Sequence, residues 1–325
     1  MASKIILDCD PGVDDALAIV FAVGSPEIEL LGVTTVAGNV GLDKTTGNAL
    51  RLREFLGAGW PVTAGSAVPL LRPPMHGEDV HGASGLGRAV LPPAQAGPQT
   101  GHGVDFIIDM VLSAPGEITL VATGPLTNVA LALRREPRLP SLVRDFVIMG
   151  GSSARGNVTP AAEFNIAVDP DAAAIVFSAG WTVTMIGLDV TLQARANQAI
   201  RDRLATLGRL AADLLLPCLA GYTDGALAEG ALAEGTVAEA AAPGRADPAV
   251  HDVCAVAHVA RAGLLGCDAA RVEVETMGRW TTGMTVTDFR APVATRNALV
   301  ATTIDVPAFW DTVFDAYSHV ARNLR

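Results

Sequence analysis

The chain has 325 residues, half of them hydrophobic and 18% charged, and its formal net charge is -11. This composition excludes disordered and fibrous proteins, and the acidic balance without a basic patch argues against nucleic acid as a partner. The length fits one large α/β domain.

Short apolar runs alternate with amphipathic segments along most of the chain. Strands are predicted at 4–9, 28–36, 118–122, 146–149 and 182–186, and helices at 14–23, 43–56, 104–112, 126–135 and 171–179. Strands of continuous hydrophobicity that alternate with helices are typical of a parallel sheet covered on both faces. The predicted fold class is therefore α/β, doubly wound, with a mainly parallel central sheet. In such sheets, ligands bind beyond the carboxyl ends of the strands.

Two regions interrupt this alternation. Residues 66–102 are rich in proline, glycine and histidine, and we predict long loops there over the rim of the sheet. Residues 225–244 nearly repeat the letters ALAEG and are poor in large apolar side chains. We predict a single domain over 1–325, with a surface or lid insertion around 223–246.

The cysteines and the hydrophobic pattern indicate the cellular compartment in which we expect the protein. The four cysteines, at positions 9, 218, 254 and 267, form no CxxC pair, which favours reduced thiols over a zinc site or a disulfide framework. No uncharged apolar stretch reaches the ~20 residues that span a bilayer, and the first residues lack a signal-peptide pattern. We therefore expect a cytoplasmic protein with no membrane partner.

The stretch DCDPGVDDA follows the apolar run 5–7 and contains Asp8, Asp10, Asp14 and Asp15. Acidic residues in the first turn of a helix are favoured by the helix dipole, which explains Asp14 and Asp15 but not Asp8 and Asp10. At an effective dielectric of ~20, two like charges about 4 Å apart repel by roughly 4 kcal/mol. The cluster therefore needs raised pKa values or a cation, and oxygen ligands select Mg²⁺ or Ca²⁺.

Together with Asn39 downstream, this stretch resembles the signature of the inosine-uridine nucleoside hydrolase family. Further motifs of that family follow in order and extend the resemblance over residues 5 to about 290: HGASGLG at 81–87, TGPLTN at 123–128, MGG at 149–151, GN at 156–157, AEFN at 162–165 and VHD at 250–252. A DxD pair alone would be a weak signal, whereas this ordered set is specific.

The resemblance implies a Ca²⁺-dependent enzyme that hydrolyses the N-glycosidic bond of ribonucleosides to free base and ribose. By similarity, Asp10, Asp15 and Asp252 bind Ca²⁺ through their side chains, and Thr123 binds it through its backbone carbonyl. Asp10 is also the implied general base, which activates a Ca²⁺-bound water for attack on C1′. Asp8 is expected to support the cluster without ligating.

The resemblance also implies the substrate contacts. The positions that hold the ribose hydroxyls match Asp14, Asn39, Asn157, Glu163, Asn165 and Asp252. Met149 matches a position that packs beneath the sugar, His251 matches the proposed general acid, and His81 matches a position near the base. An unperturbed histidine pKa near 6.5 suits acid catalysis around neutrality. Asn157 or Asn165 taken alone would equally fit a loop cap.

The base pocket and the assembly are less defined by the sequence. Family members often place an aromatic residue before the HD motif; Tyr222 is the candidate, although the 223–246 segment separates it from His251. The base preference remains open. The resemblance further implies a role in nucleoside salvage or catabolism and a homo-oligomer, either a dimer or a tetramer.

The residue pattern also allows two alternative functions. One is a Mg²⁺-dependent phosphatase of the haloacid dehalogenase type, which also begins with a strand and a DxD pair, although Pro11-Gly12 follows the pair here. The other is a non-catalytic ribonucleoside-binding protein, which the presence of both Asp10 and His251 disfavours.

Overall fold

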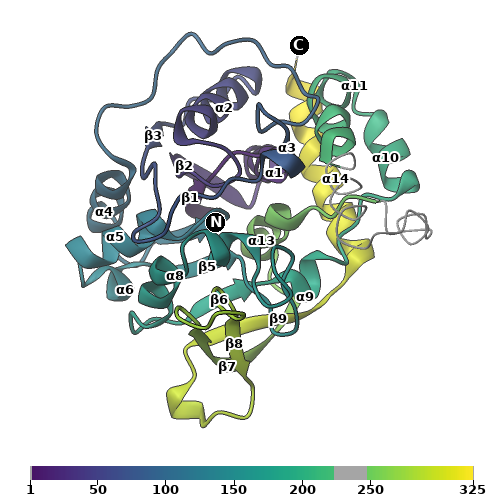
Figure 1. Ribbon diagram of the computed structural model, residues 1–325. Coiled ribbons are helices and arrows are strands. Elements are labelled where there is room, and N and C mark those ends of the chain that lie inside the picture. Colours follow the sequence, from purple (N-terminus) through teal and green to yellow (C-terminus); the bar gives the residue numbers. More distant parts are fainter. Residues whose placement is uncertain (1, 223–246, 325) are drawn as a thin grey trace.

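The computed structural model describes residues 2–222 and 247–324, and these residues form one central sheet. Its strands are β1 (Ser3–Cys9), β2 (Ile28–Thr35), β3 (Val62–Ala64), β4 (Ile118–Ala122), β5 (Asp145–Met149), β6 (Val183–Ile186), β7 (Leu265–Val274), β8 (Thr285–Asp288) and β9 (Ala298–Ile304). They lie in the order β3-β2-β1-β4-β5-β6-β9-β7-β8 (Figure 1). Strands β1 to β6 and β9 are parallel, whereas β7 runs antiparallel to both β9 and β8.

Helices cover both faces of this sheet, as the α/β prediction required (Figure 1). One layer contains α1 (Val13–Gly24), α2 (Leu42–Phe55), α13 (His251–Ala260) and α14 (Val306–Asn323), and the other contains α4 (Gly103–Ser113), α5 (Thr127–Arg135), α6 (Leu139–Leu142) and α8 (Pro170–Phe177). The shorter elements are α3 (Glu78–His81), α7 (Phe164–Val168), α9 (Leu188–Thr191), α10 (Gln198–Ala205), α11 (Gly208–Leu210), a π-helical turn (Ala211–Leu215) and a 3₁₀ turn (Val293–Thr295).

Strand β1 shows why the sheet has two apolar faces. Its residues alternate between the faces, so Ile5, Leu7 and Cys9 pack in the core on the α1 side, and Ile6 packs in the core on the α5 side. Asp8 follows Ile6 on the α5 side, where it bonds to Asn128. Each face of the sheet therefore has an apolar core beneath its helices. Asp8, at the end of β1, is the one residue of these five alternating positions that brings a carboxylate into the buried layer.

The predicted strands and helices are confirmed, with ends that differ by at most two residues. The sequence pattern missed the strands β3, β7, β8 and β9 and the helices α13 and α14. Strand β7 has the sequence LGCDAARVEV, whose small and charged residues give little strand signal, and only three of its ten residues are buried. No helix in the described ranges is both long and apolar enough to cross a membrane.

Strand β1 lies between β2 and β4, so the order of the parallel strands reverses at this point. Loops leave β1 and β4 toward opposite sides, which opens a crevice beyond their carboxyl ends. Asp10 follows β1, Asn39 follows β2 and Thr123 follows β4. The predicted site residues therefore meet at the topological switch point.

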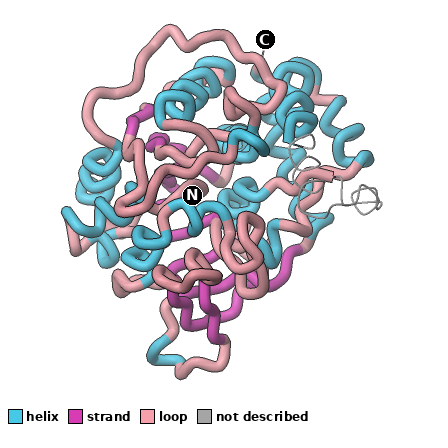
Figure 2. The backbone as a smooth tube through the Cα atoms, in the orientation of Figure 1, coloured by secondary structure: helices cyan, strands magenta, loops and turns pink. Residues whose placement is uncertain are grey.

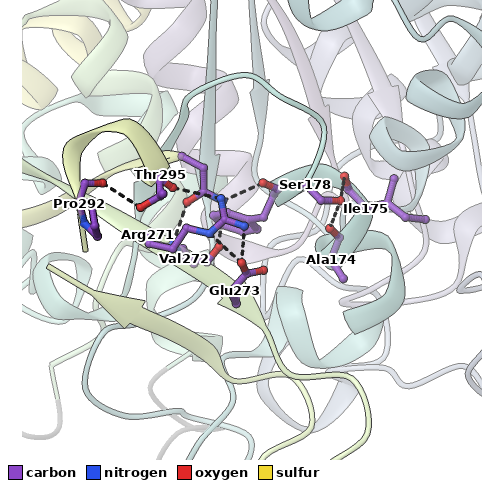
Figure 3. Close-up of polar contacts among 10 residues, drawn as sticks. Ala174, Ile175, Ser178, Arg271, Val272, Glu273, Pro292 and Thr295 are labelled. Atoms are coloured by element: carbon purple, nitrogen blue, oxygen red, sulfur yellow. Dashed lines mark hydrogen bonds and ion pairs between the residues drawn. The ribbon is translucent and has the colours of Figure 1, made fainter. Parts of the chain in front are cut away.

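The opposite edge of the sheet is a hairpin of β7 and β8 that projects from the body of the molecule (Figure 2). Figure 3 shows its polar contacts: Arg271 of β7 is paired with Glu273, and its guanidinium donates to the carbonyl of Thr295 at 3.1 Å. Thr285 of β8 fastens the hairpin to the rim, because its hydroxyl accepts from the N–H of Ser152 and donates to the carbonyl of the same residue.

Candidate active site

A pocket of about 770 Å³ lies above the switch point. It is formed by the loops after β2, β4 and β5, by the first turns of α1 and α13, and by the loop that contains α3. Every site residue predicted from the sequence lines this pocket except Asp10 and Asp15, which lie fully buried. Residues far apart in the chain are therefore brought to one cavity.

Three buried carboxylates lie together at the base of the pocket, and two of them, Asp14 and Asp252, line it. Asp14, Asp15 and Asp252 each offer an oxygen atom, and these atoms lie within 4.8 Å of one another. The first two belong to the first turn of α1 and the third to the first turn of α13, two helices that pack together. Helix dipoles lessen the cost of placing negative charge there, but they do not neutralise three buried carboxylates.

Asp10 lies beside these three carboxylates and is anchored on one side only. Its Oδ2 accepts from the N–H of Asn39 at 2.6 Å, while Oδ1 is buried and has no hydrogen-bond partner among the described residues. Glycine is needed around it, because a Cβ at Gly38 or Gly124 would come within 2.1 or 2.6 Å of its carboxylate oxygens. The backbone at Gly38 and Gly124 therefore packs against the Asp10 carboxylate and leaves no room for a Cβ atom.

Asp8 occupies a separate position on the α5 side of the sheet. Its Oδ1 accepts from the Thr34 hydroxyl at 2.5 Å and from the Asn128 side chain at 2.8 Å. Asn128 also accepts from the N–H of Ser66, so this network connects β1 to the loop after β3. Asp8 is thus bound to neighbouring side chains and is not one of the three clustered carboxylates.

Burial dominates the electrostatics of the carboxylates. It raises the pKa of Asp10 well above its ordinary value, with the Asp15 charge adding to the effect, and it raises the pKa of Asp14 to about 7. Burial followed by the charge of Asp14 also raises the pKa of Asp252. All four groups ionise together only if a cation is bound, and an all-oxygen donor set with an unpartnered Asp10 Oδ1 fits a hard divalent cation.

Glu163 and Asn165 shape the wall next to β4 and β5. The Glu163 carboxylate caps α7 by accepting from the N–H groups of Asn165 and Ile166, and it also accepts from the N–H of Gly151. The Asn165 amide donates to the carbonyls of Thr123 at 2.8 Å and Met149 at 3.0 Å. Burial raises the pKa of Glu163 to about 7. These bonds fix the rim where β4 and β5 end.

Asn157 differs from these two residues because it is exposed on the pocket rim. Its Oδ1 accepts from the N–H of Phe164 at 2.9 Å, which is the loop-capping arrangement that the sequence left open.

Two histidines and a tyrosine form another part of the pocket wall. The Tyr222 ring lies 5.6 Å from the His81 ring and 6.4 Å from the His251 ring, measured between centroids. His81 Nδ1 accepts from the N–H of Val13 at 3.1 Å, and His251 Nδ1 lies 2.8 Å from the Thr191 hydroxyl. Burial lowers the pKa of His81 to about 3 and that of His251 to about 4, so both rings are neutral near pH 7.

A pocket with buried carboxylates on its floor and neutral histidines on its wall suits a sugar substrate with an aromatic leaving group. Residues 5–311 match the family model of inosine-uridine preferring nucleoside hydrolases. The chain belongs to this family.

The similarity to known proteins covers nearly the whole chain. The chain is 43% identical to the inosine-uridine preferring nucleoside hydrolase of Leishmania major, over 98% of this chain and 99% of that protein. It is 41% identical to the non-specific ribonucleoside hydrolase RihC of Salmonella typhi, with 97% of this chain and 98% of that protein covered. The purine-preferring ribonucleoside hydrolase of Gardnerella vaginalis has the same fold, with a TM-score of 0.89, 33% identity and coverage of 99% and 100%.

These matches confirm the nucleoside hydrolase fold and identify the chain as an enzyme that hydrolyses the N-glycosidic bond of ribonucleosides. They give no support to the phosphatase alternative or to a binding protein without catalysis. The acidic cluster agrees with metal dependence in this nucleoside hydrolase.

The base side of the pocket is where the sequence was least informative. Distance along the chain placed Tyr222 in doubt, yet its ring contacts His81 and approaches His251, because α13 returns to the rim next to residue 222. The predicted insertion around 223–246 lies outside the described residues. Thr191 was missed, and no local motif marks it, since only the fold brings α9 against the start of α13.

Proposed function

We propose that this nucleoside hydrolase uses Ca²⁺ held by Asp10, Asp15, Asp252 and the Thr123 carbonyl, with Asp10 as the general base. The observation that carries the proposal is the buried, unpartnered Oδ1 of Asp10 beside the three clustered carboxylates. A bound Ca²⁺ would hold the attacking water and increase its acidity. Ca²⁺ is preferred over Mg²⁺ because it accepts a large, irregular set of carboxylate and carbonyl oxygens.

In the proposed reaction, Asp10 accepts a proton from the water as the water attacks C1′ of the ribose. Oδ2 of Asp10 is already bound by the N–H of Asn39, which leaves Oδ1 to take that proton. The bond between C1′ and the base breaks with its electron pair on the base, and the sugar acquires oxocarbenium character. The negative floor of the pocket stabilises this positive charge.

The ribose hydroxyls are proposed to bind Asp14, Asn39, Asn157, Glu163, Asn165 and Asp252, with Met149 beneath the sugar. These residues line one wall and the floor of the pocket. A buried polar group that loses its hydroxyl partner costs about 1–3 kcal/mol, so ribonucleosides should react faster than deoxyribonucleosides.

The departing base is proposed to lie between His81 and His251. A neutral His251 does not supply a proton as an imidazolium would, so we assign it hydrogen-bond donation to the leaving base. The resemblance implies a general acid at His251, and in this proposal the residue assists the leaving base through a hydrogen bond. The base then receives its proton from solvent.

The test is release of reducing sugar from a panel of purine and pyrimidine ribonucleosides and their 2′-deoxy forms. Activity is expected with Ca²⁺, loss of activity with a chelator, and recovery on adding Ca²⁺ in excess. Recovery with Mg²⁺ but not with Ca²⁺ would contradict the metal assignment. Binding of nucleosides without any turnover would contradict the enzymatic role.

We also propose that the chain forms one domain and assembles as a homo-oligomer, a dimer or a tetramer. The β7–β8 hairpin supports assembly because Met277 and Trp280 are 90% and 77% exposed on it. Light scattering coupled to size exclusion should give a multiple of the 33.4 kDa chain mass. Trp280→Glu is the matched variant, since a smaller particle is expected if the hairpin carries the interface.

The cellular setting that we propose is nucleoside salvage or catabolism in the cytoplasm. All four cysteines are free thiols in the structure, which agrees with a reducing compartment. Fractionation of cells that produce the tagged protein would test the location.

A further inference from the structure

His251 is held by a single hydroxyl group on the side away from the pocket. Thr191, the last residue of α9, is fully buried, and its Oγ1 lies 2.8 Å from Nδ1 of His251. Within residues 2–222 and 247–324, this is the one hydrogen bond of the Thr191 hydroxyl. Since His251 lines the pocket, its other ring nitrogen, Nε2, is the one left for a ligand.

The hydrogen bond between these side chains can run in either direction, and burial decides between them. If Nδ1 of His251 carried a hydrogen, it would donate to Thr191, and the hydrogen of the buried hydroxyl would have no acceptor among the described residues. A buried donor without a partner is costly. If the hydroxyl donates to Nδ1, both atoms are satisfied and the ring hydrogen lies on Nε2.

The backbone keeps the two side chains in register. The N–H of Thr191 donates to the carbonyl of Gly187 at 3.1 Å, and its carbonyl accepts from the N–H of Ala194 at 3.1 Å. The carbonyl of Ala194 in turn accepts from Val250, the residue directly before His251, at 3.0 Å. The loop that contains Thr191 is therefore bonded to the point where α13 begins.

We propose that Thr191 is a positioning residue, which fixes His251 in the tautomer with its hydrogen on Nε2 and thereby presents an N–H to the leaving base. The inference rests on the proposed function of His251. When the glycosidic bond breaks, its electron pair stays on the base, and the Nε2–H group stabilises that charge by a hydrogen bond. The water supplies its hydroxide to C1′ and its proton to Asp10, and solvent protonates the base.

The matched variants are Thr191→Val, which removes the hydroxyl and keeps the shape, and Thr191→Ser, which keeps the hydroxyl. With inosine or uridine, Thr191→Val should lower kcat by about 10-fold or more, less than the 10²–10³-fold loss on removing a transition-state donor outright. KM should stay near the wild-type value. With nitrophenyl riboside, kcat should change less than about 2-fold. Its leaving group departs readily without a hydrogen-bond donor, so a weaker hydrogen bond from His251 has little effect on the rate.

Thr191→Ser should retain the wild-type kcat on both kinds of substrate. An unchanged kcat of Thr191→Val on inosine and uridine would overturn the proposal. Equal losses on nucleosides and nitrophenyl riboside, or equal losses in the Val and Ser variants, would also overturn it, because a merely structural role affects every substrate alike.

Nitrogen NMR of the ¹⁵N-histidine-labelled enzyme tests the tautomer without any turnover. The His251 signals are identified by their absence in His251→Gln. In the wild type, Nε2 should be protonated and Nδ1 should not, and Thr191→Val should lose this preference. A proton on Nδ1 in the wild type would overturn the proposal even if Thr191→Val does not fold. If no ribonucleoside is hydrolysed, the proposed function fails, whereas the NMR result still decides the role of Thr191.

Discussion

The N–H of Asn39 binds Oδ2 of Asp10 at 2.6 Å, while Oδ1 of the same carboxylate is buried and has no partner in residues 2–222 and 247–324. One half of the carboxylate is therefore fixed by the backbone, and the other half is available for a cation or a proton. Asp8 Oδ2 is likewise buried without a partner among the described residues, so what distinguishes Asp10 is its position beside Asp15 and Asp14, where burial and the charges of these two residues raise its pKa. This position agrees with the double role, ligand and base, that we propose for Asp10.

Asp10→Asn should abolish most activity and leave the fold intact. Asparagine has nearly the same shape and can still accept the hydrogen bond from Asn39, but it cannot take a proton from water. The expected fall in kcat is about 10²–10⁴-fold, the usual contribution of a general base. Steady-state kinetics measure it, and a melting curve in chelator should show equal or higher stability, because asparagine cannot acquire the negative charge that burial disfavours at this position.

Asp8→Asn is the control for that substitution. Asp8 is equally buried in the same strand, yet it bonds to Thr34 and Asn128 and is not one of the three clustered carboxylates. We expect its kcat to remain within about 10-fold of the wild type, since it contributes support and no proton transfer. If kcat of Asp8→Asn falls as far as that of Asp10→Asn, the assignment of Asp8 as a supporting residue is wrong.

Gly124→Ala should impair catalysis by displacing Asp10. A Cβ at position 124 would lie 2.6 Å from Oδ1 of Asp10, which is closer than the atoms can approach, so the carboxylate has to move. Misplacement of a reacting group by 1 Å can cost about 10²-fold in rate. The matched control is Gly47→Ala in α2, where a Cβ meets nothing within 4 Å and alanine favours the helix. Wild-type kcat in Gly124→Ala would contradict the tight packing around Asp10.

Asn165→Ala should weaken both the fold and metal binding. The substitution removes the donor that binds the carbonyls of Thr123 and Met149, and a buried carbonyl without a partner costs about 1–3 kcal/mol. Urea unfolding in chelator measures the loss of stability, and titration calorimetry with Ca²⁺ measures the affinity. Asn157→Ala is the comparison: Asn157 is exposed, so its unfolding free energy should fall less.

The stability of the metal-free protein should decrease between about pH 6.5 and 8. The pKa values of Asp14 and Glu163 are raised to about 7, and those of Asp10 and Asp252 are also raised, so the folded state keeps protons that the unfolded state has released. Such groups stabilise the fold below their unfolded pKa, and this contribution is lost as the pH rises through the folded pKa. Ca²⁺ would bind the ionised forms of Asp10 and Asp252 and lie close to Asp14, so it should reduce the loss.

The two histidines change the stability of the folded state in the opposite direction, lowering it as the pH falls, and they do so at lower pH. Because their folded pKa values are lowered, to about 4 for His251 and about 3 for His81, the unfolded state takes up protons first as the pH falls below about 6.5. The window from 6.5 to 8 therefore isolates the carboxylates. Melting temperatures with chelator and with Ca²⁺ should diverge across it, and a constant difference would exclude the carboxylate cluster as the Ca²⁺ site.

The sequence by itself determined the α/β class, most strands and helices up to residue 186, and the family. These follow from local information, because the periodicity of apolar residues reports which faces are buried and the ordered motifs keep their spacing. The stretch DCDPGVDDA also indicated a cation, since four carboxylates in eight residues are too close to ionise freely.

Only the tertiary structure decided how the neighbouring aspartates divide their contacts. Asp8 accepts a hydrogen bond from Asn128 on the α5 face of the sheet, whereas Asp14 and Asp15 meet Asp252 at the junction of two helices. The fold also brought Tyr222 to the histidines and Thr191 to His251. Such pairs join segments far apart in the chain, and their geometry depends on how helices pack over the sheet, which no local pattern of residues encodes.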